Sequence, residues 1–202
     1  MEVNATTVKE LREKTGAGFM DCKKALAETG GNLEKAVDYL RQKGLAAAAK
    51  KADRVASDGA VGAYVHPGGK IGVLVEINCQ TDFVARTTEF QTLLKDIAMQ
   101  VAAASPRYVR REEVAADELE REQSIYRQQA LEQGKPEPIV GKIVEGKLER
   151  FYSEVCLLEQ AFIKDPDRKV SDIIADAVAR LGENIQVRRF ARFHLGDAAP
   201  KA

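Results

Sequence analysis

Residues 61–79 read VGAYVHPGGKIGVLVEINC and contain the clearest periodic pattern of the chain. Valine, alanine or isoleucine recurs at every second position in two runs, 61–65 and 71–77. Such alternation is typical of half-buried β-strands. Because the HPGG turn at 66–69 separates the two runs, the pattern predicts a β-hairpin.

A third alternating run predicts one more strand beside this hairpin, since two strands alone are only marginally stable. It covers residues 185–195, and the residues expected on one face are Ile185, Val187, Ala191, Phe193 and Leu195. Apolar spacing of three and four residues elsewhere predicts helices. The expected helices cover three short segments of residues 1–43 and then 88–104, 117–132, 136–155 and 171–181. The predicted fold is therefore α+β, with a small antiparallel sheet packed by helices.

Several of these helices begin beside a side chain that can accept a hydrogen bond from the first turn. The expected caps are Thr7 with Glu10, Asn32, Thr88 with Gln91, and Ser171. The second helix is expected to end at Gly30-Gly31 and the last at Gly182, since glycine is common just after a helix.

A change in composition suggests where the domains begin and end. Residues 1–43 form the first domain, and an Ala- and Lys-rich segment, 44–58, is expected to be a partly helical linker. The α+β core domain then spans 59–197, and 198–202 are expected to form a disordered tail.

Composition excludes several classes of function. Lys plus Arg and Asp plus Glu number 31 each, so the net charge is zero and direct binding of nucleic acid is not expected. No apolar run is long enough to cross a membrane, and the N-terminus lacks the features of a secretory signal. The three cysteines are far apart in sequence, which is typical of reduced thiols in a cytoplasmic protein.

Nothing in the sequence forms a recognisable catalytic, metal or nucleotide site. The two histidines, His66 and His194, have no nearby set of ligands, and no glycine-rich phosphate loop is complete. The acid-rich segment 118–122 could hold paired carboxylates, but a solvated helix face explains it more simply. We therefore expect a binding protein rather than an enzyme, with no cofactor and no metal.

Two segments stand out as candidate binding sites. Phe19 and Met20 stand at the start of a predicted helix and could form a small docking patch; alternatively, Phe19 fills the core of the first domain. The segment 81–86, TDFVAR, connects a buried strand to a helix, and such short connections often carry function. For Phe83 taken alone, burial in the core is the more common outcome.

Two long strings give the sequence a clear resemblance to the elongation factor Ts family. They are TGAGFMDCKKAL, residues 15–26, and NCQTDFVAR, residues 78–86. Shorter matches include LLEQ at 157–160 and GENI at 182–185, so the resemblance extends in order to about Leu195.

The resemblance implies a ubiquitin-associated-like three-helix N-terminal domain and an exchange activity. The expected partner is the GTPase elongation factor Tu, from which members of the family release GDP. The segment matching Thr81, Asp82, Phe83 and Val84 then disturbs the magnesium site of the GTPase, with the phenylalanine wedged between two of its helices. Phe19 and Met20 are expected to contact the same nucleotide-binding domain. The Asp82 carboxylate is expected to cap the turn that carries Phe83.

The chain departs from longer members of the family, which carry two similar core subdomains. A single subdomain leads us to expect a homodimer. Two other classes of function stay open on the sequence alone. The first is an adaptor that binds through residues 1–43, and the second is an enzyme that uses the acid-rich helix.

Overall fold

The computed structural model describes residues 4–197, which divide into two compact units. The first unit contains residues up to 60 together with 77–93 and 172–186. The second contains 61–76, 94–171 and the residues from 187 onward. The domain boundaries expected at 43 and 58 stay a prediction, and the expected tail, 198–202, lies outside the described residues.

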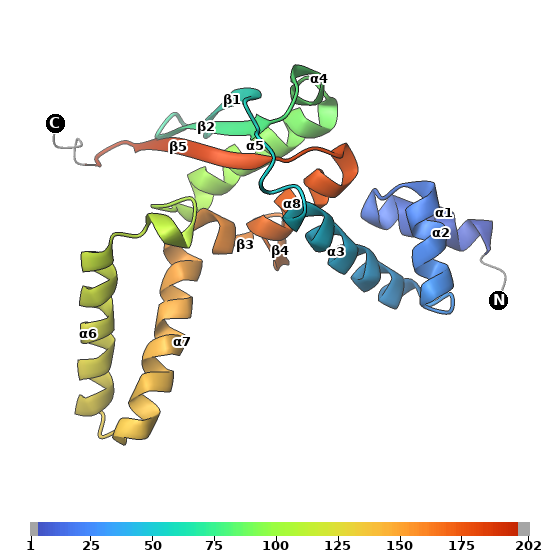
Figure 1. The fold of residues 1–202 in the computed structure, drawn as a ribbon. Coiled ribbons are helices and arrows are strands. Elements are labelled where there is room, and N and C mark those ends of the chain that lie inside the picture. Colours follow the sequence, from blue (N-terminus) through green and yellow to red (C-terminus); the bar gives the residue numbers. More distant parts are fainter. Residues whose placement is uncertain (1–3, 198–202) are drawn as a thin grey trace. The chain divides into compact units, whose positions relative to one another are not determined.

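The first unit begins with a bundle of three helices, α1 (Ala5–Thr15), α2 (Phe19–Glu28) and α3 (Leu33–Ala49). The three pack against one another (Figure 1) around a small apolar cluster. Its fully buried members are Val8, Leu11, Cys22, Ala25, Leu26 and Ala36. Helix α3 continues past residue 43, so the first part of the expected linker is helical, as predicted.

The predicted helix caps are correct at one position and displaced at three. Asn32 caps α3 by accepting a hydrogen bond from the Lys35 amide at 2.9 Å, as expected. The Thr7 prediction is wrong, because Asn4 caps α1 three positions earlier and accepts from the Thr6 amide at 3.0 Å. Any side chain with a hydrogen-bond acceptor near a helix start can compete for these amides, and the direction of the incoming backbone decides between them.

The same displacement occurs at the two later helices. Helix α5 (Thr88–Ala104) is capped by Thr87 rather than Thr88, since the Thr87 Oγ1 accepts from the Phe90 amide at 3.2 Å. Helix α8 (Val170–Leu181) begins one residue before the predicted cap, Ser171. The helix ends as predicted at Gly182, whose φ of 79° lies in the left-handed region that glycine adopts most readily.

The α+β prediction is confirmed by a three-stranded sheet in the order β1-β2-β5. Its strands are β1 (Asp58–Val65), β2 (Ile71–Cys79) and β5 (Gln186–His194). Within the second unit, the His66 amide donates to the Ile71 carbonyl, closing the predicted hairpin. The Leu195 amide donates to the Lys70 carbonyl, so the end of β5 lies beside the start of β2 and these strands are antiparallel.

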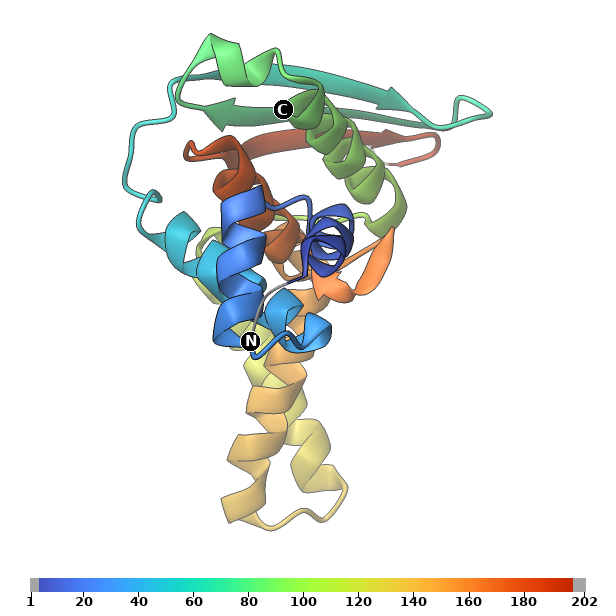
Figure 2. The same ribbon diagram turned by 90° about the vertical axis from the view of Figure 1, so that its right-hand side faces the viewer.

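One face of this sheet packs against α5, as Figure 2 shows for the elements of the second unit. Val73 and Val75 of β2 are buried on that face. Gly62 of β1 leaves room for Leu94, because a Cβ at position 62 would stand 2.6 Å from the Leu94 Cγ. The opposite face carries exposed apolar side chains, including Val61 and Leu74.

The predicted face of the third strand is wrong over its second half. Ile185 and Val187 are buried as expected, but Ala191, Phe193 and Leu195 are exposed. The intervening Arg192 is the inward residue instead, and its guanidinium donates to the Ala102 carbonyl of α5. The reason is a shift of one position at Arg188-Arg189, where two successive residues are exposed.

The rest of the second unit contains a helical hairpin of α6 (Ala116–Glu132) and α7 (Glu137–Val155). The two helices lie side by side in both ribbon views (Figures 1 and 2), as the sequence predicts. The unit also contains elements that the sequence analysis did not predict. These are two short strands, β3 (Ala161–Phe162) and β4 (Asp165–Lys169), and two 3-10 turns, η1 (Arg111–Glu113) and η2 (Leu157–Glu159).

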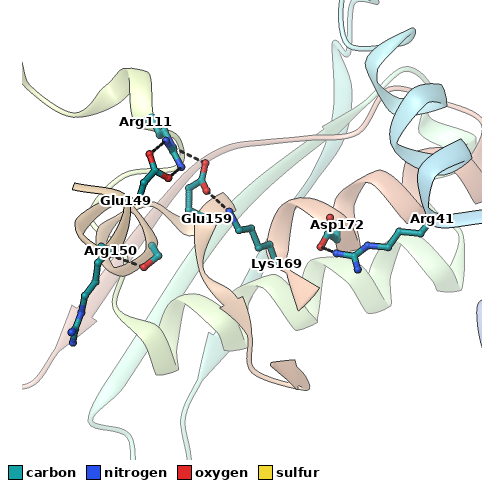
Figure 3. A network of polar contacts seen from close by, with 8 residues as sticks. Arg41, Arg111, Glu149, Arg150, Glu159, Lys169 and Asp172 are labelled. Carbon is teal, nitrogen blue, oxygen red and sulfur yellow. Dashed lines mark hydrogen bonds and ion pairs between the residues drawn. The ribbon is translucent and has the colours of Figure 1, made fainter. Parts of the chain in front are cut away.

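A network of charged side chains connects η1, η2 and β4 to the second half of α7 (Figure 3). Arg111 donates two parallel hydrogen bonds to Glu149 of α7, each 2.7 Å long, and a third to Glu159 at 2.8 Å. Lys169 of β4 pairs with the second oxygen of Glu159 at 2.8 Å. Hydrogen bonds from Arg111 lower the pKa of both carboxyl groups, which therefore stay charged at neutral pH.

Candidate functional site

The segment Thr81–Val84 follows β2 after one residue, Gln80, and its last three residues begin a single helical turn, α4 (Asp82–Ala85). The Thr81 Oγ1 accepts a hydrogen bond from the Val84 amide at 3.4 Å and so caps this turn. Beyond the turn, Thr87 donates its hydroxyl to the Val84 carbonyl at 2.8 Å. The Gln91 side chain donates to the Ala85 carbonyl at 2.7 Å. Both ends of the turn are therefore fixed by side-chain hydrogen bonds.

Phe83 extends from this turn into solvent, with 79% of its surface exposed. The turn has only one buried side chain, Ala85, which is small and faces the interior. The common expectation that a lone phenylalanine lies in the core is therefore wrong here. A large exposed aromatic ring on a fixed turn has the properties of a protein-binding residue rather than of a core residue.

The prediction that Asp82 caps this turn is wrong. Thr81 provides the cap, and the Asp82 carboxylate instead pairs with Arg86 at 2.7 Å. The reason is geometric, because the capping side chain must come from the residue that precedes the first helical position. Asp82 already has helical backbone angles, and its charge lies beside the positive end of the turn.

Glu183 provides a second set of contacts to the start of this segment. One carboxylate oxygen accepts from the amides of Gln80 and Thr81, each at 3.0 Å. The other oxygen accepts from the Thr81 hydroxyl at 2.7 Å. The sequence alone does not indicate a role for Glu183, because these contacts join positions 102 or 103 residues apart along the chain. The GENI string is the one signal in the sequence that draws attention to it.

Residues next to Glu183 and Thr81 in the sequence make further hydrogen bonds in the same region. The Asn184 amide donates to the Gln80 side chain at 2.9 Å. The Asn184 side chain, which is buried, donates to the carbonyls of Ala52 and Arg54. Below the turn, the Cys79 thiol donates to the Thr81 carbonyl at 3.1 Å. Burial, together with the nearby charge of Glu183, raises the pKa of this thiol, so it keeps the proton that it donates.

Phe19 and Met20 lie on a different element, at the first two positions of α2. Their exposed fractions are 52% and 70%, because the buried face of α2 is formed by Cys22, Ala25 and Leu26. The alternative in which Phe19 fills the core of the bundle is therefore wrong. Both side chains are free to contact another molecule.

The alternative site, in the acid-rich helix, is occupied by structural contacts. Glu118 of α6 accepts a hydrogen bond from the Tyr108 hydroxyl at 2.6 Å and pairs with Arg107. These contacts lower the pKa of Glu118, whereas a general acid needs a raised pKa. Among residues 4–197, no group of three His, Cys, Asp or Glu side chains could hold a metal ion. In the same range, none of the helices has the length and apolar character of a membrane span.

The three cysteines are free and buried, which gives a testable pattern of reactivity. Burial raises the pKa of Cys156 to about 11, and it raises those of Cys22 and Cys79 as well. Since only the thiolate is alkylated, we expect Cys156 to react with iodoacetamide at pH 8 roughly a hundredfold more slowly in the folded protein than in urea. Mass spectrometry of samples taken at successive times measures the rate at which Cys156 is alkylated. Rapid alkylation of Cys156 in the folded protein would contradict its burial.

Comparison with known proteins shows similarity to one family over nearly the whole chain. The family model described as elongation factor TS matches residues 4–197. The protein named elongation factor Ts of Heliobacterium modesticaldum is 64% identical over 98% of this chain and 93% of its own length. That of Geobacter sulfurreducens is 63% identical over 100% of this chain and 93% of its own. That of Desulforamulus reducens is 62% identical over 99% of this chain and 92% of its own length.

Proposed function

Since the chain belongs to the elongation factor Ts family, we propose that it is a guanine nucleotide exchange factor for elongation factor Tu. It binds the GDP-bound GTPase, promotes release of GDP and so allows GTP to bind. The observation that carries this proposal is the exposed ring of Phe83, held on a turn that is fixed at both ends. The activity forms and breaks no covalent bond, so it requires no acid, base, nucleophile or cofactor of its own. It takes place in the cytoplasm, where translation occurs.

In this proposal Thr81, Asp82, Phe83 and Val84 act on the magnesium site of the GTPase. Phe83 inserts between two helices of the nucleotide-binding domain and displaces the elements that hold the ion. A segment of one turn is suited to this task, because its only large exposed apolar side chain is the one that must enter the partner. Phe19 and Met20 contact the same domain of the GTPase through the start of α2 and contribute affinity.

Exchange of this kind follows from thermodynamic linkage. A protein that binds the nucleotide-free GTPase more tightly than the loaded form must weaken nucleotide binding by the same factor. To convert a GTPase that is 1% nucleotide-free into one that is 99% nucleotide-free, the protein must bind the nucleotide-free form more tightly by about 5.5 kcal/mol. Burial of one phenylalanine supplies roughly 1.5–3 kcal/mol. Loss of the magnesium contacts to the phosphates therefore has to supply much of the remainder.

A single mixing experiment tests the proposed function. Elongation factor Tu loaded with fluorescent GDP is mixed with excess unlabelled nucleotide, with and without this protein. The proposal predicts that the protein accelerates the fluorescence decay in a saturable manner. An unchanged decay at all protein concentrations would contradict it.

We further propose that the protein forms a homodimer through the uncovered face of its sheet. Within the second unit this face carries a group of exposed apolar side chains. They are Val61, Val65, Leu74, Phe193 and Leu195. Two copies related by a two-fold axis would cover one another, since the inner faces of packed sheets are apolar. Because each copy has a single core subdomain, the dimer supplies the second one.

A charged substitution on this face tests the dimer. We expect Phe193→Asp to halve the mass measured by size-exclusion chromatography with light scattering, because the carboxylate would lose its water in the interface. Ile139→Asp is the matched control, since Ile139 is an exposed apolar residue of α7, away from the sheet. A monomeric wild-type protein, or a Phe193→Asp variant of unchanged mass, would contradict the sheet-mediated dimer.

A further inference from the structure

The start of the Phe83 turn depends on one carboxylate from a distant part of the sequence. Glu183 lies just after α8, where the chain changes direction at Gly182. It accepts three hydrogen bonds, from the amides of Gln80 and Thr81 and from the Thr81 hydroxyl. Since β2 ends at Cys79, these two amides lie beyond the end of the strand, and Glu183 supplies an acceptor for each of them.

The hydroxyl contact also determines how Thr81 caps the turn. A threonine hydroxyl has one proton to donate and two lone pairs that accept. The proton is directed at the Glu183 Oε1, 2.7 Å away, so the lone pairs face the Val84 amide. Hydrogen bonds to a charged acceptor are about twice as strong as neutral ones. The carboxylate thus fixes the rotamer of the cap as well as the backbone before it.

We propose that Glu183 is a positioning residue that holds the Phe83 turn in the orientation required for nucleotide exchange. This role rests on the proposed function, since Glu183 acts through Phe83 and not on the GTPase itself. The position of Glu183 is fixed in turn by its neighbour Asn184, which bonds Gln80 and the backbone at Ala52 and Arg54. Without the carboxylate, the turn keeps its sequence but loses its fixed direction, and Phe83 samples orientations that do not fit the partner.

A fluorescent reporter measures this orientation without any partner. The chain contains five tyrosines but no tryptophan, so Phe83→Trp introduces a single tryptophan at the exposed position, and its fluorescence can be excited selectively at wavelengths that tyrosine does not absorb. In that background, we expect Glu183→Ala to increase the amplitude of fast motion in the anisotropy decay at least twofold. The amplitude for Glu183→Gln should lie between those for the unchanged Glu183 and for Glu183→Ala, because the glutamine amide oxygen still accepts hydrogen bonds from the backbone. Glu89→Ala is the control, since it removes a carboxylate of the same unit that pairs with Arg180 of α8.

Exchange kinetics then show whether Glu183 acts through Phe83. We expect Glu183→Ala to lower stimulated GDP release at least fivefold in the wild-type background and less than twofold in the Phe83→Ala background. If Glu183 only stabilised the fold, its substitution would lower the rate of GDP release by the same factor in the wild-type and Phe83→Ala backgrounds. If Glu183→Ala melts below the assay temperature by circular dichroism, Glu183→Gln replaces it in both measurements, with at least a twofold loss expected in the wild-type background alone.

The possible results separate this proposal from the proposed function. An unchanged anisotropy decay, or an equal loss of exchange in both backgrounds, would overturn the role of Glu183 while leaving Phe83 as the exchange residue. Full exchange activity of Phe83→Ala would overturn the wedge and, with it, the role of Glu183 in exchange. The positioning role is supported if Glu183→Ala increases the fast motion of the tryptophan at position 83 and lowers exchange only where Phe83 is present.

Discussion

Replacing Phe83 with alanine should slow the release of GDP from elongation factor Tu roughly tenfold to a hundredfold. This range follows from the roughly 1.5–3 kcal/mol gained when a phenylalanine is buried, at about 1.4 kcal/mol for each factor of ten. The energy is gained only in the complex, because the free protein leaves 79% of the ring in solvent. Fluorescent GDP release, measured over a range of variant concentrations, gives both the maximal rate and the half-saturating concentration.

The stability of Phe83→Ala should equal that of the wild type within about 0.5 kcal/mol, as is usual for exposed positions. Val55→Ala is the matched control for loss of exposed apolar surface, because Val55 is 80% exposed and lies outside the turn. We expect it to exchange at the wild-type rate. A Phe83→Ala variant that is fully active, or one that unfolds, would contradict the wedge mechanism.

The same substitution at Phe90 should have the opposite pattern of effects. Phe90 lies in the first turn of α5, shortly after the exposed turn, and its side chain is 0% exposed. Truncation of a buried phenylalanine to alanine costs about 3–5 kcal/mol, from lost burial and from the cavity left behind. Because domains are stable by only about 5–15 kcal/mol, Phe90→Ala should remove a large part of the free energy of unfolding.

Urea unfolding followed by circular dichroism measures this effect as a lower midpoint. Phe83→Ala serves as the control, since it removes the same atoms from an exposed position of the same unit. At temperatures where Phe90→Ala remains folded, we expect exchange to be close to that of the wild type. An unchanged midpoint for Phe90→Ala would show that the interior beneath the turn is not packed as the structure has it.

These two phenylalanines show how far the sequence alone could lead. Phe90 belongs to the apolar pattern that predicts a helix over residues 88–104, and the apolar face of such a helix is expected to be buried, as Phe90 is. Phe83 belongs to no such stripe, so its residue type alone favours burial, and the structure shows the reverse. Its expected role came from the resemblance of the string that contains it.

The helix caps and the outer half of β5 differ from the sequence prediction because both depend on backbone detail at single residues. Thr7, Thr88 and Asp82 are each able to cap a helix, yet Asn4, Thr87 and Thr81 do so. A cap depends on the backbone angles of a single residue. Apolar periodicity predicts which face of a helix is buried, but it does not predict at which residue the helix begins. The outer half of β5 presents the opposite face from the one that alternation predicts, because a shift of one position reverses every side chain after it.

The sequence by itself determined the α+β class, the hairpin, the helical segments and, through two long strings, the family. These features depend on spacing along the chain, which a sequence states directly. Only the tertiary structure decided that Phe83 faces solvent, that Glu183 holds the turn beneath it, and which half of β5 is covered. Each of these depends on contacts between segments far apart in the chain, and the energy of such contacts is fixed only once the backbone brings them together.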